Sequence, residues 1–341
     1  MKLLAILLVA LLAGCASTSP PPAAAPAPAT LLERTAASVP ALPLDAKAAV
    51  DWWSSFAQTY TARSAFTANN AAARDHIAAG LAEAGLQVRL LQYPVGAEGL
   101  ALPATAGPLF VNVVEATKPG DGEGTIALGT HYDGSAAATV QAAYDNGSGT
   151  AALYSLCTAL AKVPTRHSFT CLFFDGEELG ALGSQAYVAD PTRPVPDYYL
   201  GFDMVGLNWP GIDTTQVGKE AWKLYAWTGP EFADALFPFV NGTLHGVLGY
   251  PASGAQAFPF NDRNSDEASF AQAHVPTVRF AGGRTAGSYP QYHLPGDTVE
   301  YVEQFAGGRD RFEAGLAAVV RTAWQVALQL DQASLDDLRA R

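Results

Sequence analysis

The sequence predicts an α/β protein, a three-layer α/β/α sandwich around a largely parallel, mixed central sheet. Short apolar segments rich in β-forming residues alternate along the chain with segments whose apolar residues recur at helical spacing. Polar clusters also follow several of the apolar segments directly. Open α/β sheets bind their ligands beyond the carboxyl ends of strands, so this placement favours the same class of fold.

The individual elements follow from the same patterns. Apolar residues at helical spacing predict helices near the beginning of the domain, and Gly85 is a suitable end for the second of them. Turn-forming residues at 118–124 separate two predicted strands from a third, short and buried one. In order, we expect helices at about 44–66 and 70–84, strands at 86–93, 109–116 and 125–133, a helix at 147–162, a strand at 168–175, a helix at 180–189, a strand from Tyr198 and a last helix at about 310–330.

Composition limits the class of function. Apolar residues make up 49% of the 341 residues and charged residues 15%, so the chain can bury a sizeable core. Acidic residues outnumber basic residues 32 to 20, which gives a net charge of −12. An acidic chain without a basic block is a poor candidate for binding nucleic acid or an anionic lipid surface.

The first residues are typical of an exported protein. Lys2 provides a short positive region, and residues 3–12 form an apolar stretch that is too short to span a bilayer as a helix. The letters LAGC, ending at Cys15, resemble a bacterial lipoprotein cleavage box, which implies that residues 1–14 are removed and Cys15 is lipidated. Ala16 follows, which in such lipoproteins implies sorting to the outer membrane, with the domain facing the periplasm. An ordinary signal peptide with an incidental cysteine is the alternative.

Residues 15–43 are rich in alanine and proline and cannot build a core, so we expect a tether there. A single domain is then expected at 44–341. Cys157 and Cys171 lie in that domain, and export would permit a disulfide bond between them, but sequence alone leaves their geometry open.

Acidic and histidine side chains recur in five short clusters: THYD at 130–133, YDNGSG at 144–149, DGEELG at 175–180, FDMVG at 202–206 and YHLPGDT at 292–298. Each cluster alone has an ordinary structural explanation, such as a turn or a solvated loop. Asp203 is harder to explain in this way, because burying an unpaired carboxylate in a strand costs several kcal/mol of folding free energy. Imidazole and carboxylate ligands together suit zinc, and a carboxylate on a tight turn, such as Asp145, could bridge two ions.

The order of these motifs, together with SDEASF at 265–270, resembles metallopeptidase family 28, the zinc aminopeptidases. The resemblance covers about residues 67–302. It implies a zinc-dependent exopeptidase, an aminopeptidase that hydrolyses the N-terminal residues of peptides with a metal-activated water. Carried over motif by motif, it implies that His131 and Asp203 bind one zinc ion, that Glu178 and His293 bind another, and that Asp145 bridges them.

The resemblance also implies two residues that act beside the metals. Glu177 would be the general base, and Asp133 would orient His131, as a ligating histidine usually requires. Asp175 is expected to be a structural residue at a strand end. One departure from the family lies at Glu267, where these peptidases often have histidine, and the change is expected to alter the polarity of the substrate pocket.

Two other functions remain open at this point. Glutaminyl cyclases of the same clan keep most of these positions but use a single zinc ion, and both DGEE and Asp266 fit them. A non-catalytic lipoprotein that binds peptides is the second alternative, although the residues expected for catalysis are all present. A serine hydrolase is disfavoured because the chain has no Gly-x-Ser-x-Gly motif.

Overall fold

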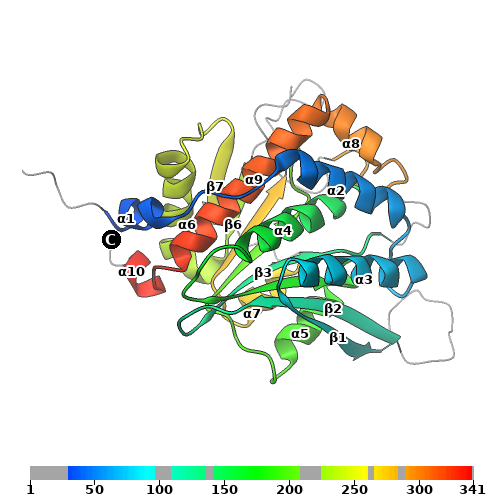
Figure 1. The fold of residues 1–341 in the computed structure, drawn as a ribbon, viewed down its shortest axis with the longest axis horizontal. Coiled ribbons are helices and arrows are strands. Elements are labelled where there is room, and N and C mark those ends of the chain that lie inside the picture. The colour runs from blue at the N-terminus through cyan, green and yellow to red at the C-terminus, as the bar shows by residue number, and fades with distance from the viewer. Residues whose placement is uncertain are drawn as a thin grey trace, which may run out of the picture.

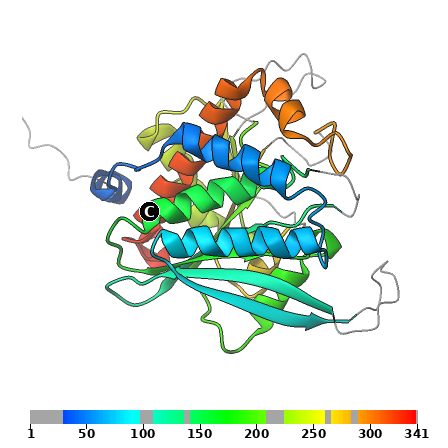
Figure 2. The same cartoon turned by 45° about the vertical axis from the view of Figure 1, so that its right-hand side comes forward.

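The structure, a computed structural model, describes residues 30–96, 109–135, 141–207, 224–259, 265–282 and 289–339. Within these ranges the strands form one eight-stranded sheet in the order β1-β2-β4-β3-β5-β8-β6-β7. Helices cover both faces of the sheet (Figure 1), and a view turned by 45° shows the same arrangement (Figure 2). The predicted three-layer α/β/α fold is therefore confirmed.

The strands are β1 (Gln87–Val95), β2 (Leu109–Lys118), β3 (Thr125–His131), β4 (Ser168–Phe174), β5 (Tyr198–Asp203), β6 (Leu224–Thr228), β7 (Ala255–Pro259) and β8 (Thr277–Gly282). The pairs β3–β4, β3–β5, β5–β8 and β6–β7 are parallel. The pairs β1–β2, β2–β4 and β6–β8 are antiparallel. The centre of the sheet is thus parallel, and antiparallel pairs lie toward both edges.

The α-helices are α1 (Leu31–Ser38), α2 (Ala46–Thr59), α3 (Ala68–Glu83), α4 (Gly147–Leu160), α5 (Leu182–Ala189), α6 (Ala233–Gly242), α7 (Glu267–Gln272), α8 (Val299–Ala306), α9 (Arg309–Leu330) and α10 (Leu335–Arg339). Short helical turns occur at η1 (Glu177–Leu179), η3 (Pro230–Phe232) and η4 (Thr243–Val247). Helices α5 and α7 pack on one face of the sheet, α3, α4 and α6 pack on the other, and α2 and α9 pack against α4.

Alternation along the strands explains the two cores. In β4, Phe173 belongs to the larger hydrophobic cluster under α4 and α9, whereas its neighbour Phe174 belongs to the smaller cluster under α5 and α7. Successive side chains of a strand point to opposite faces. Because both faces of the central strands are buried, these strands appear in the sequence as continuous apolar runs.

The N-terminal boundary of the domain differs from the prediction. Part of the expected tether, residues 15–43, is helix α1, which contacts α9. Trp324 of α9 donates a hydrogen bond to the carbonyl of Pro40 at 2.8 Å, so the chain after α1 is also part of the packed fold. Thr30 and Glu33 form a capping box that starts this helix. Cys15 and residues 1–14 lie outside the described residues.

Further differences lie later in the chain. The helix predicted at 180–189 is α5, which begins two residues later at Leu182 because Gly180 and Ala181 have left-handed backbone conformations, and the short turn η1 precedes it. Elements β6 to β8 and α6 to α8 were not predicted. Cys157 of α4 and Cys171 of β4 form a disulfide bond, with Cα atoms 6.4 Å apart. Among the described helices, none combines the length and the apolar character that crossing a membrane requires.

Candidate metal centre

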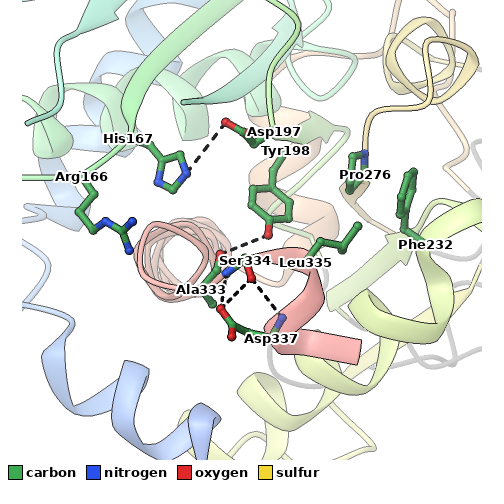
Figure 3. Close-up of a pocket in the computed structure, with 10 residues that line it drawn as sticks. All are labelled: Arg166, His167, Asp197, Tyr198, Phe232, Pro276, Ala333, Ser334, Leu335 and Asp337. Carbon is green, nitrogen blue, oxygen red and sulfur yellow. Dashed lines mark hydrogen bonds and ion pairs between the residues drawn. The ribbon is translucent and has the colours of Figure 1, made fainter. Parts of the chain in front are cut away.

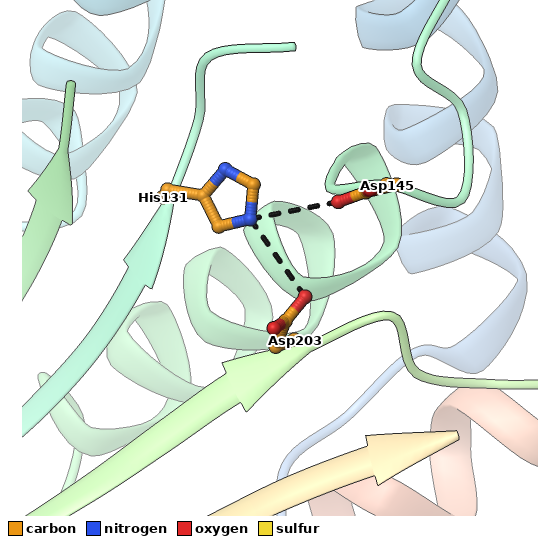
Figure 4. A group of neighbouring side chains, drawn as sticks. All are labelled: His131, Asp145 and Asp203. Carbon is orange, nitrogen blue, oxygen red and sulfur yellow. Dashed lines mark ion pairs between the residues drawn. The ribbon is translucent and has the colours of Figure 1, made fainter. Parts of the chain in front are cut away.

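The parallel strands bring two of the predicted ligands together at the carboxyl-terminal end of the sheet. His131 is the last residue of β3, and Asp203 is the last residue of β5, the parallel neighbour of β3. Asp145 lies just before α4, whose N-cap is Asn146. The three side chains converge at this end of the sheet (Figure 4).

One group of ligands is formed by His131, Asp145 and Asp203. His131 Nε2 lies 3.6 Å from Asp145 Oδ1 and 3.7 Å from Asp203 Oδ1. One ligand atom from each residue falls within 4.8 Å of those of the other two. A cation placed among them would therefore meet one nitrogen and two oxygen ligands.

A second group shares Asp145 with the first. His293 Nε2 lies 3.2 Å from Asp145 Oδ2 and 2.9 Å from Glu178 Oε2. Asp145 therefore presents Oδ1 to His131 and Oδ2 to His293. This is the arrangement that a carboxylate bridging two metal ions requires, since two-metal sites hold their ions about 3.5–4 Å apart.

The turn after β4 places Glu177 and Glu178 beside these groups. Glu177 Oε2 lies 3.9 Å from His131 Nε2. Gly176 has φ 72°, and a Cβ atom there would lie 2.9 Å from Val111 Cγ1. Glycine at this position allows the chain to reverse direction tightly, so that both glutamates face back over the end of the sheet.

Asp133 contacts both the first histidine and this turn. Its Oδ1 lies 3.4 Å from His131 Nδ1, which is long for a hydrogen bond but within ion-pair range. The same carboxylate accepts hydrogen bonds from the backbone N–H groups of Glu177 and Glu178, each at 3.3 Å. Asp133 is fully buried, so its position is fixed by these contacts.

The electrostatics of the centre favour a cation. Burial, together with the charge of Glu178, raises the pKa of Asp145 to about 6. Burial also raises the pKa of Glu177 well above its ordinary value, although His131 opposes the shift. Hydrogen bonds to Asp145 and Glu178 raise the pKa of His293 to about 10. Raised pKa values of this kind indicate crowded negative charge, which a divalent cation would relieve.

One buried carboxylate oxygen at the centre has no partner. Glu178 Oε1 has no hydrogen-bond partner among the described residues, whereas the other unbonded atom, His131 Nδ1, faces Asp133. Buried polar atoms are rarely left unpaired, so a free carboxylate oxygen at such a centre calls for an additional ligand. Imidazole nitrogen and carboxylate oxygen are the donors that zinc accepts, and the residues present fit that ion.

The pKa of Asp203 is shifted in the opposite direction to that of Asp145. Burial alone would raise the pKa of Asp203, but contacts with His131 and the charge of Arg279 outweigh burial, and the pKa is lowered. Asp203 is therefore held as a carboxylate, the form that a metal ligand needs.

Asp175 is structural, as the sequence indicated. Its carboxylate accepts a hydrogen bond from Asn70 Nδ2 at 2.9 Å and from the backbone N–H of Asn112 at 3.3 Å. It is fully buried and ties β4 to α3 and β2 beneath the centre. None of these contacts directs it toward the candidate ligands.

The segment that departs from the family forms an ion pair. Glu267 contacts Arg279 of β8 at 2.9 Å, and both residues are buried. The side chain at this position is therefore part of the packing between α7 and β8. Its neighbour Asp266 is 2% exposed, and neither of its carboxylate oxygens has a hydrogen-bond partner among the described residues. Burial raises the pKa of Asp266 to about 7.

Three residues around the centre were not found from the sequence. The ring of Tyr292 stacks on His293 with centroids 3.7 Å apart, which orients the imidazole. Asp297 accepts a hydrogen bond from the backbone N–H of Asp145. Arg63 is buried below the loop that precedes Asp145. Tyr292 and Asp297 lie in the quoted run YHLPGDT, whereas nothing in the sequence around Arg63 points to the centre.

A cavity of about 450 Å³ lies at the amino-terminal end of the sheet (Figure 3). His167, Tyr198 and Pro276, which precede or begin β4, β5 and β8, line it together with residues 333–335 and Asp337. It therefore meets the amino ends of the strands whose carboxyl ends carry the candidate ligands. None of the candidate ligands lines it, so we assign the chemistry to the metal centre.

The chain is similar in sequence to known aminopeptidases. The chain is 26% identical over 168 residues to aminopeptidase YwaD of Bacillus subtilis, covering 48% of this chain and 34% of that protein. It is 29% identical over 214 residues to leucine aminopeptidase 2 of Arthroderma otae, covering 57% of this chain and 41% of that protein. The chain thus spans less than half the length of these curated relatives.

Solved structures share the fold. A zinc aminopeptidase from Bacillus subtilis superimposes with a TM-score of 0.68 at 16% identity, covering 87% of this chain and 98% of that one. A glutaminyl cyclase from Porphyromonas gingivalis gives a TM-score of 0.63 at 17% identity, covering 85% and 99%.

The family assignment rests on a match that spans the candidate ligands. Residues 112–309 match the family described as Peptidase family M28, and this range is more than half of the chain. It includes His131, Asp145, Glu178, Asp203 and His293. The chain belongs to peptidase family M28.

Proposed function

We propose that this chain is a zinc-dependent aminopeptidase that removes N-terminal residues from peptides and holds two zinc ions. The observation that carries the proposal is the position of Asp145, whose two carboxylate oxygens face different histidines. Each histidine is completed by a further carboxylate, Asp203 for His131 and Glu178 for His293. The aminopeptidases to which the chain is similar support the same activity.

In the proposed reaction, zinc supplies Lewis acidity that lowers the pKa of water and polarises the peptide carbonyl group. The carboxylate of Glu177 takes a proton from the attacking water and delivers it to the leaving amine. Burial raises the pKa of Glu177, which makes its carboxylate a stronger base for this proton transfer. Asp133 holds the backbone of Glu177 and Glu178 and contacts His131, so it keeps base and ligand in a fixed relation.

A glutaminyl cyclase with a single zinc ion is the second candidate, and the cyclase structure with the same fold supports it. The shared carboxylate of Asp145 favours the peptidase. A site for one metal ion needs one group of ligands, whereas this centre has two groups that share Asp145. Counting the ions therefore separates the two candidates.

The first experiment is to measure metal per chain after zinc reconstitution and desalting, in protein that lacks residues 1–14 and has Cys15 replaced. The proposal expects about two zinc ions, as in other dinuclear sites, and hydrolysis of aminoacyl-p-nitroanilides. About one ion, with cyclisation of glutaminyl peptides and no hydrolysis, would replace the aminopeptidase with the cyclase. No zinc and no turnover would leave a peptide-binding protein.

A variant isolates the base from the ligands. Glu177→Gln should keep the zinc content and lose hydrolysis by about 100-fold or more, the scale of general base catalysis. Glu83→Gln is the matched control, because Glu83 is an exposed glutamate at the end of α3. Wild-type turnover in Glu177→Gln would remove this residue from the mechanism.

We also propose that the protein is a bacterial outer-membrane lipoprotein, anchored through lipid on Cys15 and facing the periplasm. The LAGC run that ends at Cys15 and the Ala/Pro-rich residues after it support the proposal. Replacement of Cys15 with serine should move the active protein from the membrane fraction to the soluble fraction. Unchanged fractionation would refute the lipid anchor.

A further inference from the structure

Arg63 is a fully buried arginine in the turn between α2 and α3. Its guanidinium donates hydrogen bonds to three backbone carbonyls: Tyr132 at 2.6 Å, Ala142 at 2.7 Å, and Gln141. Among the described residues no carboxylate lies within ion-pair distance of it. A buried charge is costly, so the energy of burying Arg63 must be offset by these carbonyl groups and by charges farther away.

The carbonyl groups that Arg63 binds belong to two segments with candidate ligands. Tyr132 lies between His131 and Asp133, and Ala142 lies three residues before Asp145. Carboxylates of the centre are close enough for their charges to act on Arg63. Burial lowers its pKa to about 10, and the charges of Asp297, Asp133, Asp145 and Glu178 act in the opposite direction.

Asp297 binds the same loop from the other side. Its Oδ1 accepts a hydrogen bond from the backbone N–H of Tyr144 at 2.9 Å, and its Oδ2 accepts one from that of Asp145 at 3.0 Å. Tyr289 donates its hydroxyl to Oδ1 at 2.9 Å. Asp297 is 1% exposed and follows His293 by four residues, so it also connects this loop to the second histidine.

The loop of residues 141–145 therefore has its peptide groups held by side chains of opposite charge. Arg63 binds carbonyl oxygens, Asp297 binds N–H groups, and Trp53 Nε1 donates to the carbonyl of Ala143 at 2.7 Å. This backbone is neither helix nor strand, and Ala142 has φ 50°. Buried, irregular backbone needs such partners, because each unpaired peptide group is costly.

We propose that Arg63 and Asp297 are positioning residues for the metal centre, which together hold the loop of residues 141–145 so that the carboxylate of Asp145 lies between the two histidines. The inference rests on the proposed dinuclear site. A carboxylate that bridges two ions must keep both oxygens in place, and a backbone fixed by two charged side chains restricts it more than packing alone. Neither residue is expected to touch the substrate.

The test uses cobalt(II)-loaded protein as well as zinc-loaded protein. Arg63→Met removes the charge and the donors, Arg63→Lys keeps the charge but not the three-carbonyl fork, and Asp297→Asn replaces one accepting oxygen with an N–H donor. We expect kcat to fall by about 10–100-fold in Arg63→Met and Asp297→Asn, the range for residues that orient metal ligands. KM should change by less than about 2-fold, since substrate contacts are preserved.

Two further readouts do not depend on turnover. The visible absorption of cobalt(II) should shift or weaken in both variants, and zinc should pass to a chromophoric chelator about 10–100-fold faster than from wild type. Arg63→Lys should lie between wild type and Arg63→Met in all of these measurements. If Arg63→Met does not fold, Asp297→Asn and Arg63→Lys decide the question.

A control variant separates positioning from general stability. Gln329 is fully buried in α9, where it bonds Thr35 Oγ1 at 3.1 Å and the Leu32 carbonyl at 3.2 Å. Gln329→Met should lower the melting temperature but leave the cobalt spectrum, the zinc release rate and kcat unchanged.

The outcomes distinguish this inference from the proposed function. If wild-type protein binds two ions and hydrolyses peptides, but Arg63→Met and Asp297→Asn keep its cobalt spectrum and zinc release rate, the positioning role is wrong. If wild-type protein binds no metal, the proposed function is wrong, and the positioning role, which rests on it, is wrong as well.

Discussion

Asp133 Oδ1 accepts a hydrogen bond from the backbone N–H of Glu177 at 3.3 Å, although 44 residues separate the two in the chain. The same oxygen lies 3.4 Å from His131 Nδ1. One buried carboxylate thus connects the candidate ligand at the end of β3 with the candidate base after β4. Its removal should affect both groups together.

Asp133→Asn should lower kcat about 10–100-fold, because the amide cannot accept hydrogen bonds at both of its terminal atoms and no longer stabilises one orientation of His131. Steady-state kinetics on an aminoacyl-p-nitroanilide, together with zinc content, would measure the effect. Asp121→Asn is a suitable control, since Asp121 is exposed in the turn before β3. Equal activity in the two variants would contradict the role of Asp133.

Zinc should stabilise the folded protein, because it relieves the repulsion among Asp145, Glu178 and their neighbours and binds only the assembled centre. At a free concentration about 100 times the dissociation constant, the stabilisation is about 2.7 kcal/mol, which corresponds to a rise of roughly 5 °C in melting temperature. Thermal unfolding with and without a chelator would measure it. His293→Ala should show a smaller shift and about one ion fewer, and an unaltered shift in that variant would remove His293 from the centre.

The bond between Cys157 and Cys171 should contribute about 3 kcal/mol to stability, the value expected for a closed loop of about 15 residues. The two cysteines are 14 residues apart and join α4 to β4. Urea unfolding of Cys157→Ala/Cys171→Ala, in protein that already lacks Cys15, would measure the difference.

A reductant provides the control for this measurement. Dithiothreitol should destabilise the parent protein if it reaches the bond, and it should leave the double variant unchanged. If the double variant is as stable as its parent, the bond has no net effect on stability.

The ion pair of His167 and Asp331, at the amino-terminal end of the sheet, should make the stability of the protein depend on pH. His167 Nδ1 lies 3.1 Å from Asp331 Oδ1, and this contact raises the pKa of His167. Burial would raise the pKa of Asp331, but hydrogen bonds from His167 and from backbone N–H groups outweigh burial and lower it. The stabilising effect of the raised histidine pKa is complete below about pH 6.5 and is lost as pH rises through the folded-state value, whereas that of Asp331 is lost as pH falls below about 4.

The free energy of unfolding should therefore differ more between wild type and His167→Gln at pH 5.5 than at pH 9. Urea titrations at both pH values would measure the two differences. His76→Gln should show the opposite trend, because burial lowers the pKa of His76. A difference for His167→Gln that is equal at both pH values would refute the ion pair as a source of stability.

Much of the fold follows from local pattern. β3, β4 and β5 are short apolar runs that end at polar residues, and α4 begins at a run of small residues after the Asn146 cap. Period and length were sufficient for these elements. The later strands β6 to β8 were missed because they are short and their neighbouring segments carry no clear period.

The candidate site divides in the same way. The order of the motifs and the family resemblance that it carries were enough to name His131, Asp145, Glu178, Asp203 and His293 as candidate ligands. The parallel pairing of β3 and β5 accounts for the meeting of His131 and Asp203, because parallel strands place their carboxyl ends side by side. The shared position of Asp145 between two histidines needed coordinates, since only these show which oxygen faces which ring.

Local sequence decided where helices and strands form and which side chains follow them, because spacing along the chain determines which face is buried. The three-dimensional packing alone decided the contacts of Arg63 and Asp297 with the loop of residues 141–145, and the packing of α1 on α9 in place of an extended tether. The partners of Arg63 are up to 79 residues away. A contact between residues so far apart produces no periodic pattern in the sequence. It forms only when folding buries the charged side chain beside peptide groups from a distant part of the chain.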